Sequence, residues 1–417
     1  MNDKELLNRV KGVKTASRIL SSVSTETKNS VLYTLAGLIM KKKGVILKEN
    51  LKDINNARKN KLSESMTDRL TLNEKRILEM SKGAREIAAL ADPISDVINE
   101  HTASSGIKIQ KVRVPLGVIC MIYEARPNVT VDATALCLKS GNAVILRGGS
   151  EAINSNRILA GIIRQALSTA GLPENAVLFI DSTDRKFIYK LIKMDTLIDL
   201  AIPRGGEKMV NEIRKHSTVP VLSHGKGLCA TYIDKSADKN MAVKVAYNAK
   251  VQRPSVCNAT ETLLVHKDIA PEVLPGLYKM LSKAGVEIRA CANARKILPG
   301  ARQASEKDWS TEYHGLILAV KVVESLDEAI THINTYGSGH SDSIITGNKS
   351  AAEKFLKEVD SSAVLHNAST RLHDGGVFGL GCEMGISTQK IHARGAMGLN
   401  ELTSTKYLVR GTGQVRE

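Results

Sequence analysis

From Leu116 onward, short apolar runs alternate with helical patterns, and this alternation restricts the fold more than any other feature of the chain. The first apolar runs lie at 116–123, 143–146, 176–180, 197–202 and 219–222. Continuously apolar strands separated by helices are typical of a parallel sheet that is covered on both faces. The pattern therefore predicts a doubly wound α/β domain.

A second series of the same kind follows Leu228. Its predicted strands lie at 228–233, 261–265, 316–323 and 343–346, and its predicted helices at 237–249, 268–284, 326–336 and 349–359. Aromatic residues make up only 3% of the chain, whereas hydrophobic residues make up 42%. The cores of both α/β domains must therefore consist mainly of Ala, Val, Ile and Leu.

The regions outside these two series differ in pattern. The first hundred residues are predicted to be helical, with a capping box at 71–74 in which Thr71 is the N-cap. Ile107, Ile109, Val112 and Val114 alternate with polar residues, which predicts a half-exposed strand pair with a change of phase near 110–111. Such a ribbon is typical of a sheet edge or a subunit-contact arm. The glycine-rich tail after Val364 is predicted to form loops and a terminal strand.

The net charge of +16 is spread along the whole chain. No nucleic-acid-binding motif accompanies it, and four Phe and one Trp offer little for base stacking. We therefore expect no nucleic-acid partner, although part of the charge could serve an anionic substrate. The N-terminus lacks the apolar segment of a signal peptide, no apolar run is long enough to span a membrane, and the six cysteines form no CxxC pair. These features predict a cytoplasmic protein without membrane contact.

Cys257 is the main candidate for chemistry. It lies in the polar, proline-containing stretch 252–258, between a predicted helix and a predicted apolar strand. A thiol on a loop of this kind can attack a carbonyl carbon and form a thioester. The alternative is a small buried side chain, which is the commoner fate of a free cysteine. We predict such a buried, structural role for Cys120 and Cys137.

Two strand–helix junctions carry an arginine followed by two glycines. They are Arg147-Gly148-Gly149 and Arg204-Gly205-Gly206. Ligands of open α/β sheets bind at the carboxyl ends of strands, and a helix N-terminus attracts anions. The pair predicts a phosphate-bearing cofactor, with a plain strand–turn–helix junction as the alternative. The segment 225–230 fits GxGxxA, but it precedes a predicted strand and is therefore rejected as a dinucleotide fingerprint.

Asn128 follows a predicted buried strand and begins a helix. Its amide could donate a hydrogen bond to an oxyanion, or the residue could be an ordinary N-cap. Arg126 and Arg253 are candidates for holding an acidic substrate, with solvated surface charge as the alternative. The histidines show no metal-ligand spacing, and there is no Ser/His/Asp signature, so no metal is expected.

Five segments together resemble the γ-glutamyl phosphate reductases, a group within the aldehyde dehydrogenase superfamily. They are Ile122–Thr130, Ser140–Gly149, Gln252–Asn258, Val359–Ala363 and Ser387–Gly395. The resemblance extends over essentially the full chain. It implies an aldehyde-dehydrogenase-like α/β fold, with two doubly wound α/β domains and a small β oligomerisation element. The implied NADP-binding domain is 1–98 with 116–228, the catalytic domain is 229–365, and the oligomerisation arm and C-terminal segment are 99–115 and 366–417.

The activity that the resemblance implies is the NADPH-dependent reduction of L-glutamyl 5-phosphate to L-glutamate 5-semialdehyde, the second step of proline biosynthesis. Carried over to this chain, it makes Cys257 the nucleophile and Asn128 the oxyanion donor. It places Arg147 near the cofactor ribose, where its charge suits the 2′-phosphate of NADPH. It makes Glu312 the residue that holds the nicotinamide ribose, although His314 nearby departs from the usual apolar pattern. Ser255, with both substrate arginines, lies within the shared motifs and is expected at the substrate.

The resemblance also implies a homo-oligomer and leaves open a transient contact with glutamate 5-kinase. One departure from the superfamily is informative. Hydrolytic members carry a glutamate that activates water, whereas 223–227 of this chain contains no carboxylate. Its absence favours phosphate exchange over hydrolysis. The rival predictions are a hydrolytic aldehyde dehydrogenase that oxidises a small acidic semialdehyde, and a basic binding protein with an inactive enzyme fold.

Overall fold

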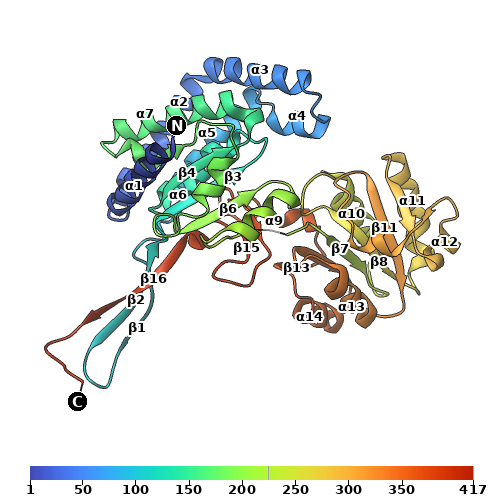
Figure 1. Cartoon of the computed structure of the whole chain (residues 1–417). Helices are drawn as coiled ribbons and strands as arrows, with labels where there is room; N and C mark the ends of the chain where they lie inside the picture. Colours follow the sequence, from blue (N-terminus) through green and yellow to red (C-terminus); the bar gives the residue numbers. More distant parts are fainter. Residues whose placement is uncertain (224, 417) are drawn as a thin grey trace. The chain divides into compact units, whose positions relative to one another are not determined.

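The two predicted α/β series form two separate units of the chain. The computed structural model describes residues 1–223 and 225–416. Unit 1 comprises Met1–Ser223, Gly379–Gly385 and Met397–Glu417, and unit 2 comprises His224–Phe378 and Ile386–Ala396. Figure 1 shows the helices and strands of each unit. The prediction of an α/β fold with parallel sheets is confirmed, while the functions of the predicted domains stay predictions.

Unit 1 contains a four-stranded parallel sheet in the order β5-β4-β3-β6. Its strands are β3 (Val118–Tyr123), β4 (Ala143–Gly148), β5 (Val177–Phe179) and β6 (Leu200–Arg204). Every residue of β3 and β4 is buried, as continuously apolar strands predict. The helices that follow them are α6 (Asn128–Lys139), α7 (Ile153–Thr169), α8 (Lys186–Leu191) and α9 (Glu207–His216).

Five helices precede this sheet, as the helical pattern of the first hundred residues predicts. They are α1 (Asp3–Leu20), α2 (Thr25–Lys41), α3 (Lys43–Lys59), α4 (Glu64–Leu70) and α5 (Glu74–Ala89). The predicted capping box at 71–74 is wrong in its cap. Asn73 is the N-cap of α5 and accepts a hydrogen bond from the Arg76 backbone N–H, while Thr71 ends α4.

Unit 2 contains a seven-stranded parallel sheet in the order β10-β9-β11-β8-β7-β12-β13. Its strands are β7 (Cys229–Ile233), β8 (Thr260–His266), β9 (Glu287–Ala290), β10 (Arg302–Gln303), β11 (Ile317–Val323), β12 (Ser341–Ile345) and β13 (Ala363–His366). Its helices are α10 (Lys239–Val251), α11 (Ala270–Lys283), α12 (Ala292–Ile297), α13 (Leu326–Tyr336) and α14 (Lys349–Glu358). Aliphatic side chains, many of them from β8, β11 and α11, form a buried cluster in unit 2, as the scarcity of aromatic residues predicts.

An antiparallel sheet of three strands, here called the arm, also belongs to unit 1. It consists of β1 (Val97–Thr102), β2 (Lys108–Pro115) and β16 (Thr403–Arg410), in that order. The predicted strand pair within 107–114 is therefore a single strand, and its partners are β1 and β16. The register shift lies between Val97 and Asn99 of β1, opposite Val112 and Lys111 of β2, and thus next to the predicted change of phase.

One predicted strand of the first series is not formed. The stretch 219–222 makes a single bridge, Ala201 to Val221, and no strand. A further short antiparallel pair, β14 (Ile386–Ser387) and β15 (Gly395–Ala396), lies in the tail. No helix in the described ranges is both long and apolar enough to cross a membrane.

Candidate active site

Cys257 lies on the loop between α10 and β8, as predicted. The helix ends at Val251, and Pro254 cannot supply the backbone N–H that a further helical turn would need. The Ala259 N–H donates to the Val256 carbonyl at 3.1 Å and closes a turn just before the strand. Cys257 is half-buried, whereas Cys120 and Cys137 are fully buried, as predicted. The thiol is therefore presented at the start of a central strand of the unit 2 sheet.

Gly227 lies directly against the backbone of Cys257. A Cβ atom at position 227 would be 2.2 Å from the Cys257 carbonyl oxygen and 2.5 Å from its Cα. Two atoms cannot approach so closely, so only a glycine fits there. The rejection of 225–230 as a dinucleotide fingerprint is confirmed, because strand β7 follows it and no helix begins there. The glycine instead allows close backbone packing beneath the thiol loop.

A second thiol, that of Cys229, forms a hydrogen bond with the same loop. Cys229 is buried, and its Sγ donates to the Cys257 carbonyl oxygen at 3.1 Å. Burial raises the pKa of Cys229 well above its usual value, so this group stays a neutral thiol and keeps its proton for the hydrogen bond. Its Sγ also lies 3.7 Å from Nδ1 of the buried His340.

Polar contacts from the tail of unit 2 hold the other side of the loop. The Asn258 side chain donates from Nδ2 to the His373 carbonyl at 3.0 Å and accepts from Arg371 Nη1. Arg371 Nε donates to Gln252 Oε1 at 2.9 Å. Burial lowers the pKa of His373 to about 4, so its ring is neutral at pH 7. Both ends of the loop are therefore tied to the segment at 371–373.

Asn128 is the first residue of α6, in unit 1. The N-cap of that helix is Pro127, so the alternative that Asn128 is an ordinary cap is wrong. Its Nδ2 donates to Asp132 Oδ2 at 2.8 Å, one helical turn further on. A carboxylate can only accept, so Asp132 holds the amide with its nitrogen toward the carboxylate and its second N–H available to another acceptor. Burial raises the pKa of Asp132 to about 6, against the opposing effects of the Asn128 hydrogen bond and the Arg204 charge.

Arg147 occupies the carboxyl end of β4 and is 5% exposed. Its Nη1 donates to the Gly148 carbonyl at 2.6 Å and its Nη2 to the Thr183 carbonyl at 3.1 Å. Within the described residues, nothing accepts a hydrogen bond from its buried Nε. Burial lowers the pKa of this guanidinium. An anion beside Arg147 would accept a hydrogen bond from Nε and would also compensate the buried positive charge.

The second Arg-Gly-Gly junction already holds an anion of the protein itself. The Gly206 N–H, at the N-cap of α9, donates to Glu124 Oε2 at 2.8 Å. A Cβ at Gly205 would lie 2.5 Å from the same oxygen. Arg204 Nη2 lies 3.8 Å from Glu383 Oε1. The glycines thus admit a carboxylate at the helix N-terminus, which is the position where the sequence predicts a phosphate.

Glu312 lies in unit 2, in the segment between the short turn at Glu306–Ser310 and β11. Its side chain is 11% exposed, and its Oε2 lies 3.4 Å from His314 Nε2. His314 has a φ of 54°, which is unusual for a residue other than glycine. The same unit holds Arg253, which is exposed, and Ser255, which is half-buried; both lie on the Cys257 loop.

The predicted site residues therefore form two groups, one in each unit. Unit 2 contains Cys257, Ser255, Arg253 and Glu312. Unit 1 contains the remaining predicted residues, which are Arg126, Asn128, Arg147, Gly148, Gly149, Arg204, Gly205 and Gly206. In unit 1, Ile122 and Tyr123 of β3 pair with Arg147 and Gly148 of β4, and Tyr123 also pairs with Arg204 of β6. These pairings bring both arginine junctions to the same side of the sheet, at the carboxyl ends of its strands.

Sequence reasoning missed several residues that shape these groups. Gly227 and Cys229 contact Cys257 although they precede it by 30 and 28 residues in the sequence, and no local pattern reveals such a contact. Glu124 was likewise not expected at the Gly206 N–H. Asp132 could have been found, because a carboxylate four residues after Asn128 lies on the same helix face.

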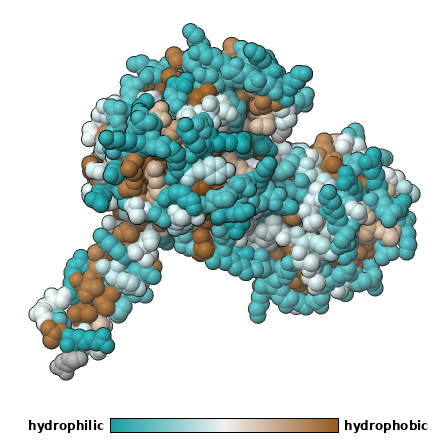
Figure 2. Space-filling view, in the orientation of Figure 1, coloured by the Kyte–Doolittle hydropathy of each residue, from teal (hydrophilic) through white to brown (hydrophobic). Residues whose placement is uncertain are grey.

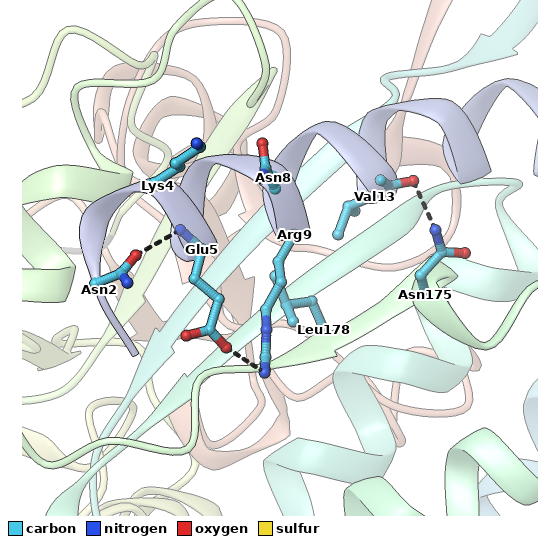
Figure 3. A pocket seen from close by; sticks show the side chains of 9 residues that line it. Asn2, Lys4, Glu5, Asn8, Arg9, Val13, Asn175 and Leu178 are labelled. Carbon is cyan, nitrogen blue, oxygen red and sulfur yellow. Dashed lines mark hydrogen bonds and ion pairs between the residues drawn. The ribbon is translucent and has the colours of Figure 1, made fainter.

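A surface hollow of about 600 Å³ lies along α1 in unit 1. Figure 3 shows Lys4, Glu5, Asn8 and Arg9 of α1 around it, with Asn175 and Leu178 opposite. None of its lining residues belongs to either predicted group. It contains a Glu5–Arg9 ion pair on an exposed helix face, which is ordinary for a surface helix.

Comparison with a protein family identifies the class. The model of the aldehyde dehydrogenase family matches residues 5–291 and 298–408 of the chain. A crystal structure of an acetylating aldehyde dehydrogenase from Geobacillus thermoglucosidasius, 16% identical, covers 99% of this chain and 98% of its own, with a TM-score of 0.72. This likeness shows the fold alone. The chain has the fold and the sequence pattern of the aldehyde dehydrogenases.

Closer relatives narrow the class. A gamma-glutamyl phosphate reductase from Halothermothrix orenii is 53% identical over 96% of this chain and 96% of its own length. One from Caldanaerobacter subterraneus is 52% identical over 98% and 99%. The crystal structure of gamma-glutamyl phosphate reductase from Thermotoga maritima is 48% identical, covers 99% of this chain and 100% of its own, and has a TM-score of 0.96. The chain therefore belongs to the γ-glutamyl phosphate reductases of the aldehyde dehydrogenase family.

The tight contact beneath Cys257 gives the first prediction. A Gly227→Ala substitution should displace the Cys257 backbone and slow alkylation of this thiol by iodoacetamide by about tenfold or more, because small displacements of a reacting group are costly. Gly225→Ala is the matched control, since its Cβ would meet only Thr388 Oγ1 at an ordinary 3.7 Å. Peptide mass spectrometry over time reports the alkylation of Cys257 itself. Equal rates in the two variants would contradict the proposed contact.

Proposed function

We propose that this chain reduces L-glutamyl 5-phosphate to L-glutamate 5-semialdehyde, with NADPH as reductant and release of phosphate, as the second step of proline biosynthesis. The observation that carries the proposal is the half-buried Cys257, held from two sides on the loop that enters β8. Relatives that share about half of its residues are named for this activity.

The proposed reaction begins at the thiolate of Cys257. Its sulfur attacks the γ-carbonyl carbon of the substrate, and the carbonyl oxygen becomes an oxyanion. Collapse of this tetrahedral species breaks the carbon–oxygen bond to phosphate and leaves a glutamyl thioester on Cys257. Hydride supplied by a bound cofactor would convert the thioester to the tetrahedral thiohemiacetal anion, and cleavage of its carbon–sulfur bond would release the aldehyde and regenerate the Cys257 thiolate.

Asn128 is proposed to donate to the oxyanion. Asp132 accepts a hydrogen bond from one N–H of Asn128 Nδ2 at 2.8 Å. This contact orients the amide, so that its second N–H can donate to an incoming oxygen. A donor that is already oriented costs no reorganisation when the negative charge develops. Arg126, Arg253 and Ser255 are proposed to bind the acidic substrate.

The proposed cofactor is NADPH, which when bound supplies the hydride. Arg147 suits its 2′-phosphate, since this buried guanidinium has a donor that nothing in the described residues uses. Gly148 and Gly149 leave room for backbone contact beside it, and Glu312 is proposed to hold the nicotinamide ribose. The second junction, Arg204-Gly205-Gly206, is proposed to face the pyrophosphate. For this role Glu124 would have to leave the Gly206 N–H.

Phosphate, and not water, is proposed as the group exchanged at the acyl carbon. Hydrolysis of the thioester requires a general base close to it. The stretch 223–227 contains no carboxylate for this role, and Gly227 packs against the Cys257 backbone. His224 lies outside the described residues. A hydrolytic aldehyde dehydrogenase would instead form the acid with no need for phosphate.

The nucleophile gives the second prediction. Cys257→Ser should lower the phosphate-dependent oxidation of pyrroline carboxylate with NADP on the order of a thousandfold or more, because an unactivated hydroxyl is a poor substitute for a thiolate. Cys291→Ser is the matched control. Cys291 is also half-buried, and serine can replace it as the N-cap of α12. Near-wild-type rates for Cys257→Ser, or oxidation that does not need phosphate, would contradict the proposal.

The oxyanion donor gives the third prediction. Asn128→Ala should lower kcat about 10²- to 10³-fold and leave NADPH affinity nearly unchanged, since one preorganised donor contributes about that much. Steady-state kinetics together with fluorescence titration of NADPH separate the two effects. A loss of NADPH affinity with kcat unchanged would assign Asn128 to the cofactor.

The arm is proposed to join copies of this chain in a homo-oligomer. All six residues of β1 are exposed, and Val97, Ile98, Tyr407 and Val409 are among the exposed large apolar side chains. Figure 2 shows apolar residues gathered on the visible face of the arm. A clustered apolar surface of this kind is typical of a protein–protein contact.

The fourth prediction tests this surface. Successive side chains of a strand point to opposite faces. Tyr407 and Val409, two residues apart on β16, therefore share one face, and Lys406 lies on the other. Tyr407→Asp/Val409→Asp should reduce the sedimentation coefficient in analytical ultracentrifugation, because buried charges would oppose association. Lys406→Glu should not change it. An unchanged species in the double variant would show that the arm does not join subunits.

A further inference from the structure

A buried ion pair closes the base of the Cys257 loop. Lys250 Nζ lies 2.5 Å from Glu261 Oε2, and the two side chains are 0% and 2% exposed. Lys250 belongs to the last turn of α10 and Glu261 is the second residue of β8. The thiol loop at 252–259 lies between them in the sequence, so the pair joins the two ends of that loop.

The same pair contacts the segment that carries Glu312. The His314 backbone N–H donates to Glu261 Oε1 at 3.2 Å, and Lys250 Nζ lies 6.0 Å from the centre of the Tyr313 ring. The charge of Glu312 acts on both members of the pair. Glu261 therefore binds Lys250 through one oxygen and the backbone that follows Glu312 through the other.

Tyr313 is itself anchored from the opposite side. Its hydroxyl donates to Asp308 Oδ1 at 2.7 Å, and the Arg289 guanidinium pairs with the same oxygen at 2.8 Å. Arg289 also lies 5.2 Å from the centre of the Tyr313 ring. The segment on either side of Tyr313 is thus held between the buried pair and the Arg289–Asp308 pair.

Stability alone does not explain the pair. Burial raises the pKa of Glu261 to about 7 and lowers that of Lys250, so the interior opposes both charges. A buried ion pair adds little stability over packed apolar side chains, whereas the loss of one partner leaves a costly unpaired charge. What the pair does provide is a defined geometry between two loops.

We propose that the Lys250–Glu261 pair is a positioning device that sets the Cys257 loop and the Glu312 segment relative to each other. In this role it aligns the thiol with the residue that holds the nicotinamide ribose. The inference rests on the proposed function, because that function assigns these roles to Cys257 and Glu312. Neither Lys250 nor Glu261 needs to touch the substrate.

The test compares two buried ion pairs of the same chain. Lys28 and Asp92 pair at 2.8 Å in unit 1, with side chains 4% and 8% exposed, and neither lies in the predicted site. Lys250→Met and Lys28→Met should lower the melting temperature by similar amounts. Only Lys250→Met should slow iodoacetamide alkylation of Cys257 and lower kcat, each by about tenfold or more, and weaken NADPH binding. Equal effects of the two variants on alkylation, kcat and NADPH affinity would overturn the positioning role.

A second variant covers the case in which Lys250→Met fails to fold. Lys250→Met/Glu261→Gln removes both charges and leaves no unpaired ion in the interior. Continued slow alkylation and weak NADPH binding in this folded double variant would support positioning, while full recovery of both would refute it. Alkylation of Cys257 requires no turnover. It therefore decides the positioning role even if the wild-type protein fails to reduce L-glutamyl 5-phosphate, an outcome that would refute only the proposed function.

Discussion

The contact between Gly227 and the backbone of Cys257 is the constraint on which the candidate site depends. Any side chain at 227 would overlap the Cys257 carbonyl, so the loop can take its position only above a glycine. The buried Cys229 thiol then fills the space beneath and donates to that carbonyl. The contacts of Asn258 with the 371–373 segment restrain the loop from the other side. These contacts give the loop residue Cys257 a defined position.

Electrostatics around this loop follow from burial. Cys229 stays protonated because the interior disfavours its thiolate, and His373 stays neutral for the same reason. Two opposite charges inside unit 2, those of Lys250 and Glu261, lie side by side at the base of the loop. In unit 1, Asp132 occupies a comparable place beside Asn128 and orients its amide. Buried polar groups therefore orient the residues proposed for chemistry and do not carry it out themselves.

The sequence predicted strands well where they are continuously apolar, as in β3 and in residues 143–146 of β4, because a strand buried on both faces has apolar residues at every position. The sequence-based prediction failed where pairing with a neighbouring strand decides whether a segment forms a strand. Strand β1 is exposed at every residue and exists through its pairing with β2, and 219–222 has the right composition but makes only one bridge. The position of Cys257 on a loop was predictable from its polar neighbours. Its contacts with Gly227 and Cys229, and the Lys250–Glu261 pair, depend on the tertiary fold.

The central claim is that Cys257 carries the acyl group between phosphate and hydride. The most direct test is to mix the protein with NADP and pyrroline carboxylate without phosphate and to quench the mixture in acid. After digestion, mass spectrometry measures the mass of the peptide that contains Cys257. The account predicts a mass increase of one glutamyl group on that peptide, which disappears when phosphate is added before the quench. No adduct on Cys257, or an adduct that is lost as free glutamate at the same rate without phosphate, would contradict it.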